Sequence, residues 1–123
     1  MIPVDHMQIA ESVVAAALRR LPTEVRQVAK SVPICYEARP NQAIVEEGWE
    51  SDILGLFVGA PYNGGSGDPH PLPPQILLFI ENIWDFAEDD VSIFRDEVRL
   101  TYLHELGHYL GWDEEEIERR GLE

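Results

Sequence analysis

Two histidines and a glutamate stand within residues 104–108, a pentad that reads His-Glu-Leu-Gly-His. The sequence around it, from Asp96 to Leu110, contains no proline and is rich in leucine, valine, arginine and glutamate, which favours an α-helix. A helix turns about 100° per residue, so the two histidines lie one turn apart on one face and the glutamate projects beside them. Two imidazoles at this spacing can bind one metal ion. The pentad therefore predicts a helix that carries a metal site.

The predicted helix also has an apolar side. Projected along the helix, this side consists of Phe94, Val98, Leu106 and Leu110. His104 and His108 fall roughly opposite to it. We therefore expect the apolar side to face the core and the histidines to face a cleft or solvent. The alternative is that they are two ordinary surface histidines on an amphipathic helix.

The residues after the pentad offer a third metal ligand. Gly111 comes three residues after His108, where a helix C-cap needs a left-handed residue, and the chain can then turn back. Two carboxylates follow. Read as HExxHxxGxxE, the pattern puts Glu114 at the third-ligand position, with Asp113 as its substitute. A competing interpretation takes the acidic run 113–116 as the solvated first turn of a last short helix.

A Zn²⁺ ion held by these residues predicts hydrolysis, and HExxH is a pattern of zinc-dependent hydrolases. Three protein ligands leave a fourth position for water, whose proton the metal makes easier to remove. Glu105 is placed to accept that proton as general base and to donate it later to a leaving amine. Tyr62 and Tyr109 are candidates for stabilising the oxyanion, although each is more often a packing residue.

Three blocks of the sequence, residues 56–59 (LFVG), 74–79 (PQILLF) and 104–114 (HELGHYLGWDE), resemble the mini-zincins, small bacterial zinc metallopeptidase-like proteins with the pattern HExxHxxGxxD. The resemblance implies a minimal zincin-like domain and one zinc ion held by His104, His108 and position 114. It also implies a peptide or protein substrate. This chain has Glu114 where the family has aspartate, which keeps Asp113 open as the ligand. The methionine turn of the metzincins is absent.

Two other functions are open on the same residues. The first is a binding protein that keeps the zincin fold without catalysis. The second is a zinc-dependent ribosomal-RNA endonuclease, because the pattern HxxxHxxGxD of such enzymes also fits this stretch. That family expects a histidine in place of Glu114, has no need of Glu105, and requires a basic surface.

Charge and length limit the partners. A net charge of −14 repels phosphate backbones, so nucleic acid is a poor partner. Residues 1–123 are the length of a single domain. No apolar run approaches the roughly 20 residues that cross a bilayer, and no export signal is visible. Cys35 is the single cysteine, which fits a reducing compartment. We expect a cytoplasmic monomer without a membrane partner.

The remaining pattern predicts an α+β fold with N-terminal helices, a small mixed or antiparallel sheet and a short C-terminal helix. The expected helices are one capped by Asp5, one over Thr23 to Lys30, and one that begins between Asp85 and Ser92 and carries the pentad. The expected strands are Val32 to Ala38, Ile53 to Val58 and Ile76 to Ile80. An acidic connection around Glu46 separates the first two strands.

Two segments are candidates for contacting substrate. In larger zincins an edge strand pairs with an extended peptide, and the resemblance assigns that role to Ile76 to Ile80. Its continuous apolar pattern argues equally for an interior strand. The glycine- and proline-rich loop from Ala60 to Pro74 is either a lid, with His70 against the substrate, or a solvated connection.

Overall fold

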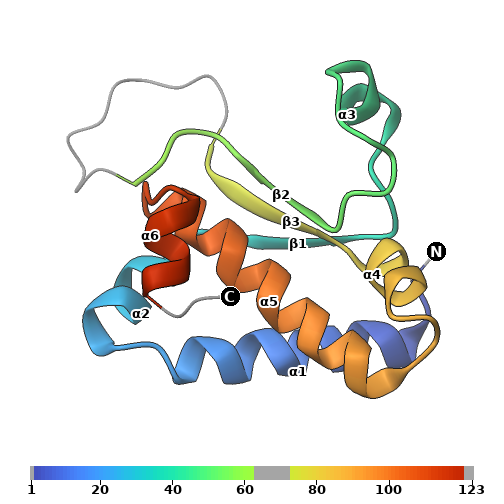
Figure 1. Ribbon diagram of the computed structural model, residues 1–123, viewed down its shortest axis with the longest axis horizontal. Helices are drawn as coiled ribbons and strands as arrows, with labels where there is room; N and C mark the ends of the chain where they lie inside the picture. The colour runs from blue at the N-terminus through green and yellow to red at the C-terminus, as the bar shows by residue number, and fades with distance from the viewer. Residues whose placement is uncertain (1, 63–72, 121–123) are drawn as a thin grey trace.

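The computed structural model describes residues 2–62 and 73–120, which form a small mixed sheet and the helices around it (Figure 1). In chain order the elements are α1 (Val4–Arg19), α2 (Thr23–Ala29), β1 (Ile34–Glu37), α3 (Gln42–Glu46), β2 (Gly55–Val58), β3 (Gln75–Phe79), α4 (Ile80–Phe86), α5 (Val91–Tyr109) and α6 (Glu114–Arg119). The predicted α+β fold, with N-terminal helices, a pentad-bearing helix and a short C-terminal helix, is confirmed.

The sheet has the strand order β1-β3-β2. β3 pairs parallel with β1, with Ile34 beside Ile76, and antiparallel with β2, with Leu56 beside Leu77. Of the two alternatives for residues 76–80, the edge strand is wrong and the interior strand is confirmed, because β3 is central. Its continuous apolar pattern belongs to an interior strand that is covered on both faces. The strand nearest the pentad that has a free edge is β2.

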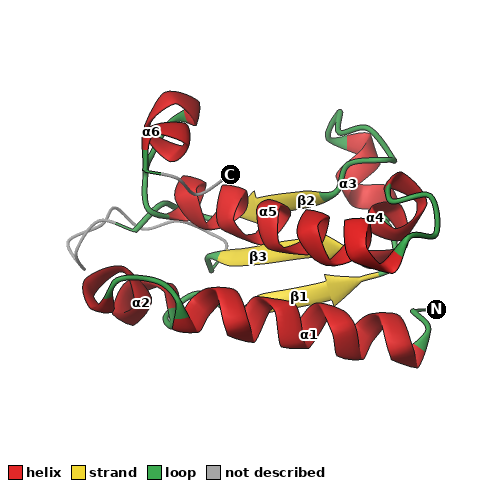
Figure 2. Ribbon diagram, turned by 60° about the horizontal axis from the view of Figure 1, so that its bottom comes forward, coloured by secondary structure: helices red, strands yellow, loops and turns green. Residues whose placement is uncertain are grey.

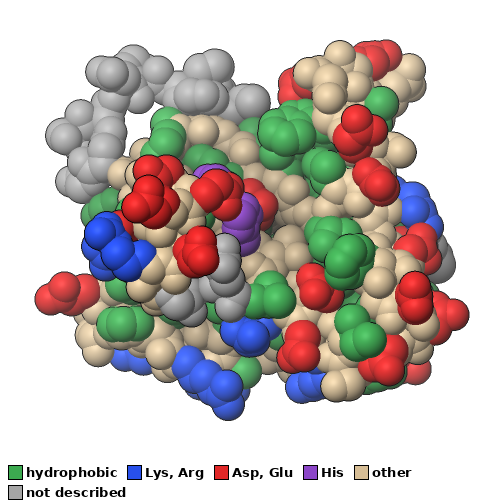
Figure 3. All heavy atoms as spheres, in the orientation of Figure 1, with side chains coloured by type: hydrophobic (Ala, Val, Ile, Leu, Met, Phe, Trp, Pro, Cys, Tyr) green, Lys and Arg blue, Asp and Glu red, His purple; other side chains and the backbone are tan. Residues whose placement is uncertain are grey.

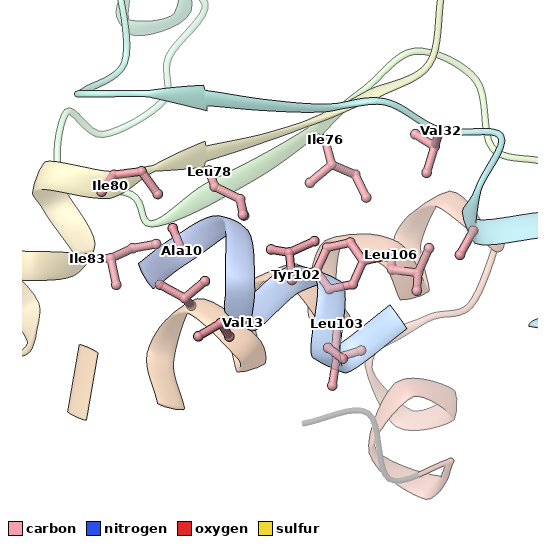
Figure 4. Close-up of a cluster of buried hydrophobic side chains, with 14 of the residues drawn as sticks. Ala10, Val13, Val32, Ile76, Leu78, Ile80, Ile83, Tyr102, Leu103 and Leu106 are labelled. Carbon is pink, nitrogen blue, oxygen red and sulfur yellow. The ribbon is translucent and has the colours of Figure 1, made fainter. Parts of the chain in front are cut away.

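The main core lies between the sheet and the helices α1 and α5, which pack against the same face (Figures 1 and 2). Figure 4 shows Tyr102 and Leu106 of α5 and Val13 of α1 on the same side of β3, below its side chains Ile76 and Leu78. The predicted core positions Phe94, Val98 and Leu106 have no exposed surface. A smaller cluster around Leu56, Leu77 and Phe79 covers the other face. Helix α5 thus has one side in the core and one side free for a site.

Three local predictions differ from the structure. Helix α1 begins at Val4 with Pro3 as its N-cap, so Asp5 lies in the first turn and does not cap the helix. The acidic connection contains α3, because the Asn41 side chain accepts the N–H of Ile44 at 2.9 Å and starts a helix there. Ile80, expected to end a strand, is the first residue of α4.

The predicted glycine- and proline-rich loop lies only partly within the described residues. Residues 63–72, which include His70 and three of the glycines, lie outside the described residues. Within the described part of the chain, no helix is both long and apolar enough to cross a membrane.

Candidate metal centre

Helix α5 carries the pentad in its last two turns. The helix begins after Asp90, whose side chain accepts the N–H of Ile93 at 2.9 Å and caps it. The side chains of His104 and His108 keep 33% and 35% of their surface exposed. The predicted division of α5 is therefore observed, with an apolar side in the core and the two imidazoles open to solvent.

A tight turn at Gly111 ends the helix and returns the chain toward the pentad. Gly111 has a φ of +83°, in the left-handed region that glycine adopts without strain. The N–H of Trp112 donates to the carbonyl of Gly107, and the N–H of Gly111 donates to the carbonyl of His108, each at 3.0 Å. These two bonds form a Schellman motif. The predicted reversal is present, and it starts α6 at Glu114.

Three potential ligand atoms meet between α5 and α6. The Nε2 atoms of His104 and His108 are 3.2 Å apart. The Oε1 atom of Glu114 lies 3.1 Å from the first and 3.2 Å from the second. Tetrahedral Zn²⁺, with ligands at about 2.0–2.1 Å, separates its ligand atoms by about 3.3 Å. The three atoms thus form a nearly equilateral triangle of the size that one zinc ion requires.

Asp113, the substitute third ligand, has a different place. Its carboxylate accepts the N–H of Glu116 at 2.9 Å and caps α6. Among the described residues, the group of three or more potential metal ligands consists of His104, His108 and Glu114. The acidic run therefore begins a helix, as the competing interpretation held, and also brings one carboxylate to the histidines.

Glu105 lies beside this cluster, against the edge of the sheet. Burial raises the pKa of its carboxyl group, while the nearby His108 and the N–H of Phe57, which donates to the carboxylate, act in the opposite direction. Gly55 permits this close approach of β2 to α5, because a Cβ atom there would lie 2.6 Å from Cγ2 of Thr101. Glu105 is thus held at the wall of the cleft by a backbone group of β2.

A cleft of about 630 Å³ opens in front of the cluster. The pentad side chains His104, Glu105 and His108 line it, together with Glu114. Its other walls come from Trp49, β2, Gly59 and Pro61. The histidine side chains reach the surface beside the acidic side chains of α6 (Figure 3). Sequence reasoning missed Trp49 and Gly55, since no motif links them to the pentad.

The two tyrosines considered for the oxyanion pack against each other, and Tyr62 keeps 42% of its surface exposed. Tyr109 is 4% exposed, and its hydroxyl shares a hydrogen bond of 2.7 Å with Oγ of Ser31. The N–H of Tyr62 donates to the carbonyl of Tyr109, and the two rings pack 6.0 Å apart. Neither tyrosine is among the described residues that line the cleft.

Gly107, inside the pentad, sets the distance between α5 and α6. A Cβ atom at this position would lie 2.4 Å from Cγ1 and 2.7 Å from Cδ1 of Ile117. Ile117 is completely buried and has little room to move aside. The missing side chain of Gly107 therefore allows α6 to rest directly on α5, which places Glu114 next to the histidines.

We expect the substitution Gly107→Ala to weaken metal binding. Alanine favours the helix by about 1 kcal/mol, but overpacking of a core costs about 1–3 kcal/mol, and a contact of 2.4 Å forces Ile117 to move. Displacement of α6 would carry Glu114 away from the imidazoles. Titration with Zn²⁺ and chemical denaturation would measure the two effects.

A second substitution tests this cause. Ile117→Ala removes the two atoms that would clash with the new Cβ and leaves only the Ile117 Cβ position, at an ordinary contact distance of 3.6 Å. The double variant should therefore lose less free energy of unfolding than the two single variants lose together, because the clash is absent. Strict additivity of the two changes would show that Gly107 does not act through Ile117.

The arrangement defines a class of fold. A small mixed sheet lies beside a helix that carries HExxH, and a following helix returns an acidic residue to the two histidines. This is a zincin-like α+β domain. The profile of the family described as zincin-like metallopeptidase matches residues 29–122, more than half of the chain. The chain belongs to this family, which confirms the predicted resemblance. No functionally curated protein matches the chain.

Proposed function

We propose that this protein is a zinc-dependent metallopeptidase. His104, His108 and Glu114 hold the zinc ion, and Glu105 is the general base. The observation that carries the proposal is the triangle of Nε2, Nε2 and Oε1 atoms, with edges of 3.1–3.2 Å, in a member of a metallopeptidase family.

The donor set fits zinc. Two imidazole nitrogens and one carboxylate oxygen are common zinc ligands, and a catalytic site keeps one position open. Here all three residues line the cleft of about 630 Å³, which has room for a further ligand. When bound, zinc polarises a carbonyl group and makes the proton of a water molecule easier to remove.

The chain supplies the proton transfer. Glu105 stands one residue after His104, and the N–H of Phe57 orients its carboxylate at the cleft wall. From this position the carboxylate accepts a proton from the water that attacks the peptide carbonyl carbon. The same oxygen then donates the proton to the amine nitrogen as the C–N bond breaks. The proton that Glu105 takes from water is the one that it gives to the amine, so Glu105 ends the cycle as a carboxylate.

The family match favours the metallopeptidase over the ribosomal-RNA endonuclease. The endonuclease pattern needs a histidine at position 114, and the carboxylate of Glu114 lies in the cluster instead. The binding protein without catalysis is an outcome of the experiment that follows.

The test is zinc-dependent hydrolysis of an unfolded protein. We expect the purified protein to hold about one Zn²⁺ per chain and to release peptides that mass spectrometry detects. A chelator should abolish the release, and Zn²⁺ should restore it. Zinc binding without any peptide release would support the non-catalytic alternative. The absence of zinc binding would refute the proposed function.

A further inference from the structure

The space around the pentad extends to both sides of Glu105. The larger hollow, of about 630 Å³, reaches past His108 to Glu114. A second hollow of about 280 Å³ lies in the other direction along α5 and is lined by Leu54, Leu100 and Thr101. The two hollows share Gly55, His104 and Glu105. A bound substrate would therefore have room on both sides of the peptide bond that is cleaved next to Glu105.

The outer edge of β2 runs along this space. The carbonyl of Leu54 accepts the N–H of Phe79 at 2.9 Å, which directs the backbone groups of Leu54 toward β3. Backbone groups alternate along an antiparallel strand, so those of Gly55 and Phe57 point away from β3. The contact between the N–H of Phe57 and Glu105 agrees with this direction. Apart from this N–H, the outward backbone groups of the edge can pair with an extended segment.

Among the described residues that line the two hollows, no charged side chain is left over to bind a chain end. The nine lysines and arginines stand at positions 19, 20, 26, 30, 39, 95, 99, 119 and 120, all within the described residues, and none lines either hollow. A lysine or arginine is the strongest hydrogen-bonding partner for a free α-carboxylate. The acids among the described lining residues are Glu105 and Glu114, which the proposed function already uses. No further acid among them is left to hold an α-ammonium group.

The walls are suited to apolar side chains. Leu54 and Leu100 line the smaller hollow, and Trp49, Phe57 and Pro61 line the larger one. Trp49 has 46% of its surface exposed, so a ligand can cover it. Removing such surface from water favours binding of apolar groups over polar ones.

We infer that the enzyme is an endopeptidase that cuts within extended segments carrying apolar side chains on both sides of the scissile bond. It does not remove residues from chain ends. The inference rests on the proposed metallopeptidase function and adds the class of substrate. The extended segment lies along β2, its two halves occupy the two hollows, and its termini lie beyond them.

The experiment compares one peptide of about ten residues in two forms. The peptide has leucine and phenylalanine around its centre, and its ends are either free or acetylated and amidated. We expect internal cleavage of both forms with kcat/KM values within about twofold of each other. Single residues released only from a free end would overturn the inference. No cleavage of either peptide or of an unfolded protein would instead count against the proposed function.

Two variants test the apolar wall. Trp49→Ala should lower kcat/KM for the blocked peptide about tenfold, mainly through KM, since loss of apolar pocket contacts changes selectivity by about 10–200-fold. Its zinc content should not change. Phe86→Ala is the control, because Phe86 is 59% exposed and lies outside both hollows. Equal kcat/KM values for the two variants would overturn the role of Trp49.

Discussion

The variant His104→Ala is expected to lose the zinc ion. Removing a partner that only orients a metal ligand costs about 10–100-fold in affinity, so the loss of a ligand should cost more than about 100-fold. The His104 side chain is 33% exposed, so the substitution should leave the fold intact. Metal analysis after dialysis against a weak chelator would measure the effect. If this variant bound as much zinc as the wild-type protein, the proposal that the pentad binds zinc would be refuted.

Two neighbouring acids provide the matched comparison for this loss. Glu114→Ala should also lose zinc, because its Oε1 atom completes the triangle. Asp113→Ala should keep zinc and instead destabilise the protein by about 1 kcal/mol, since its carboxylate caps α6. The opposite result, with zinc lost only from Asp113→Ala, would make Asp113 the ligand.

The variant Glu105→Gln is expected to keep the zinc and lose hydrolysis. Glutamine has nearly the same shape, and its amide oxygen can still accept the N–H of Phe57, but it cannot take a proton from water. A positioned general base contributes about 10²–10⁴-fold to the rate, which gives the expected decrease in kcat/KM. Peptide cleavage rates and metal analysis of the same sample separate the two properties.

Glu97→Gln is the control for this substitution. Glu97 lies on the same helix, two turns before Glu105, and lines neither hollow. It should keep both zinc and activity. If Glu105→Gln cleaved peptides at the wild-type rate, another group would have to be the base.

The candidate metal centre could be predicted from the sequence because its residues are local. His104, His108 and Glu114 lie within eleven consecutive residues, and helix geometry together with the turn at Gly111 fixes most of their arrangement. Sequence alone left Asp113 and Glu114 as alternatives. Only the position of α6 on α5, set by Gly107 and Ile117, separates a capping aspartate from a glutamate in the cluster.

The cleft could not be predicted because it depends on contacts between distant parts of the chain. Gly55 and Trp49 reach the pentad only through the pairing of β2 with β3, and no local pattern specifies that pairing. Helix α4 was missed for a different reason. It follows β3 without a break, and Phe79 at its start provides no side-chain cap that would mark the boundary.

The division of the three candidate ligands between two helices has a thermodynamic consequence. α6 rests on α5 through Ile117, and an ion bound by side chains of both helices would add a cross-link at the same corner. By linkage, an ion that binds only the folded chain stabilises it by RT ln(1 + [ion]/Kd). The melting temperature should therefore rise with free Zn²⁺, and resistance to heat becomes a measure of metal occupancy that requires no knowledge of the substrate.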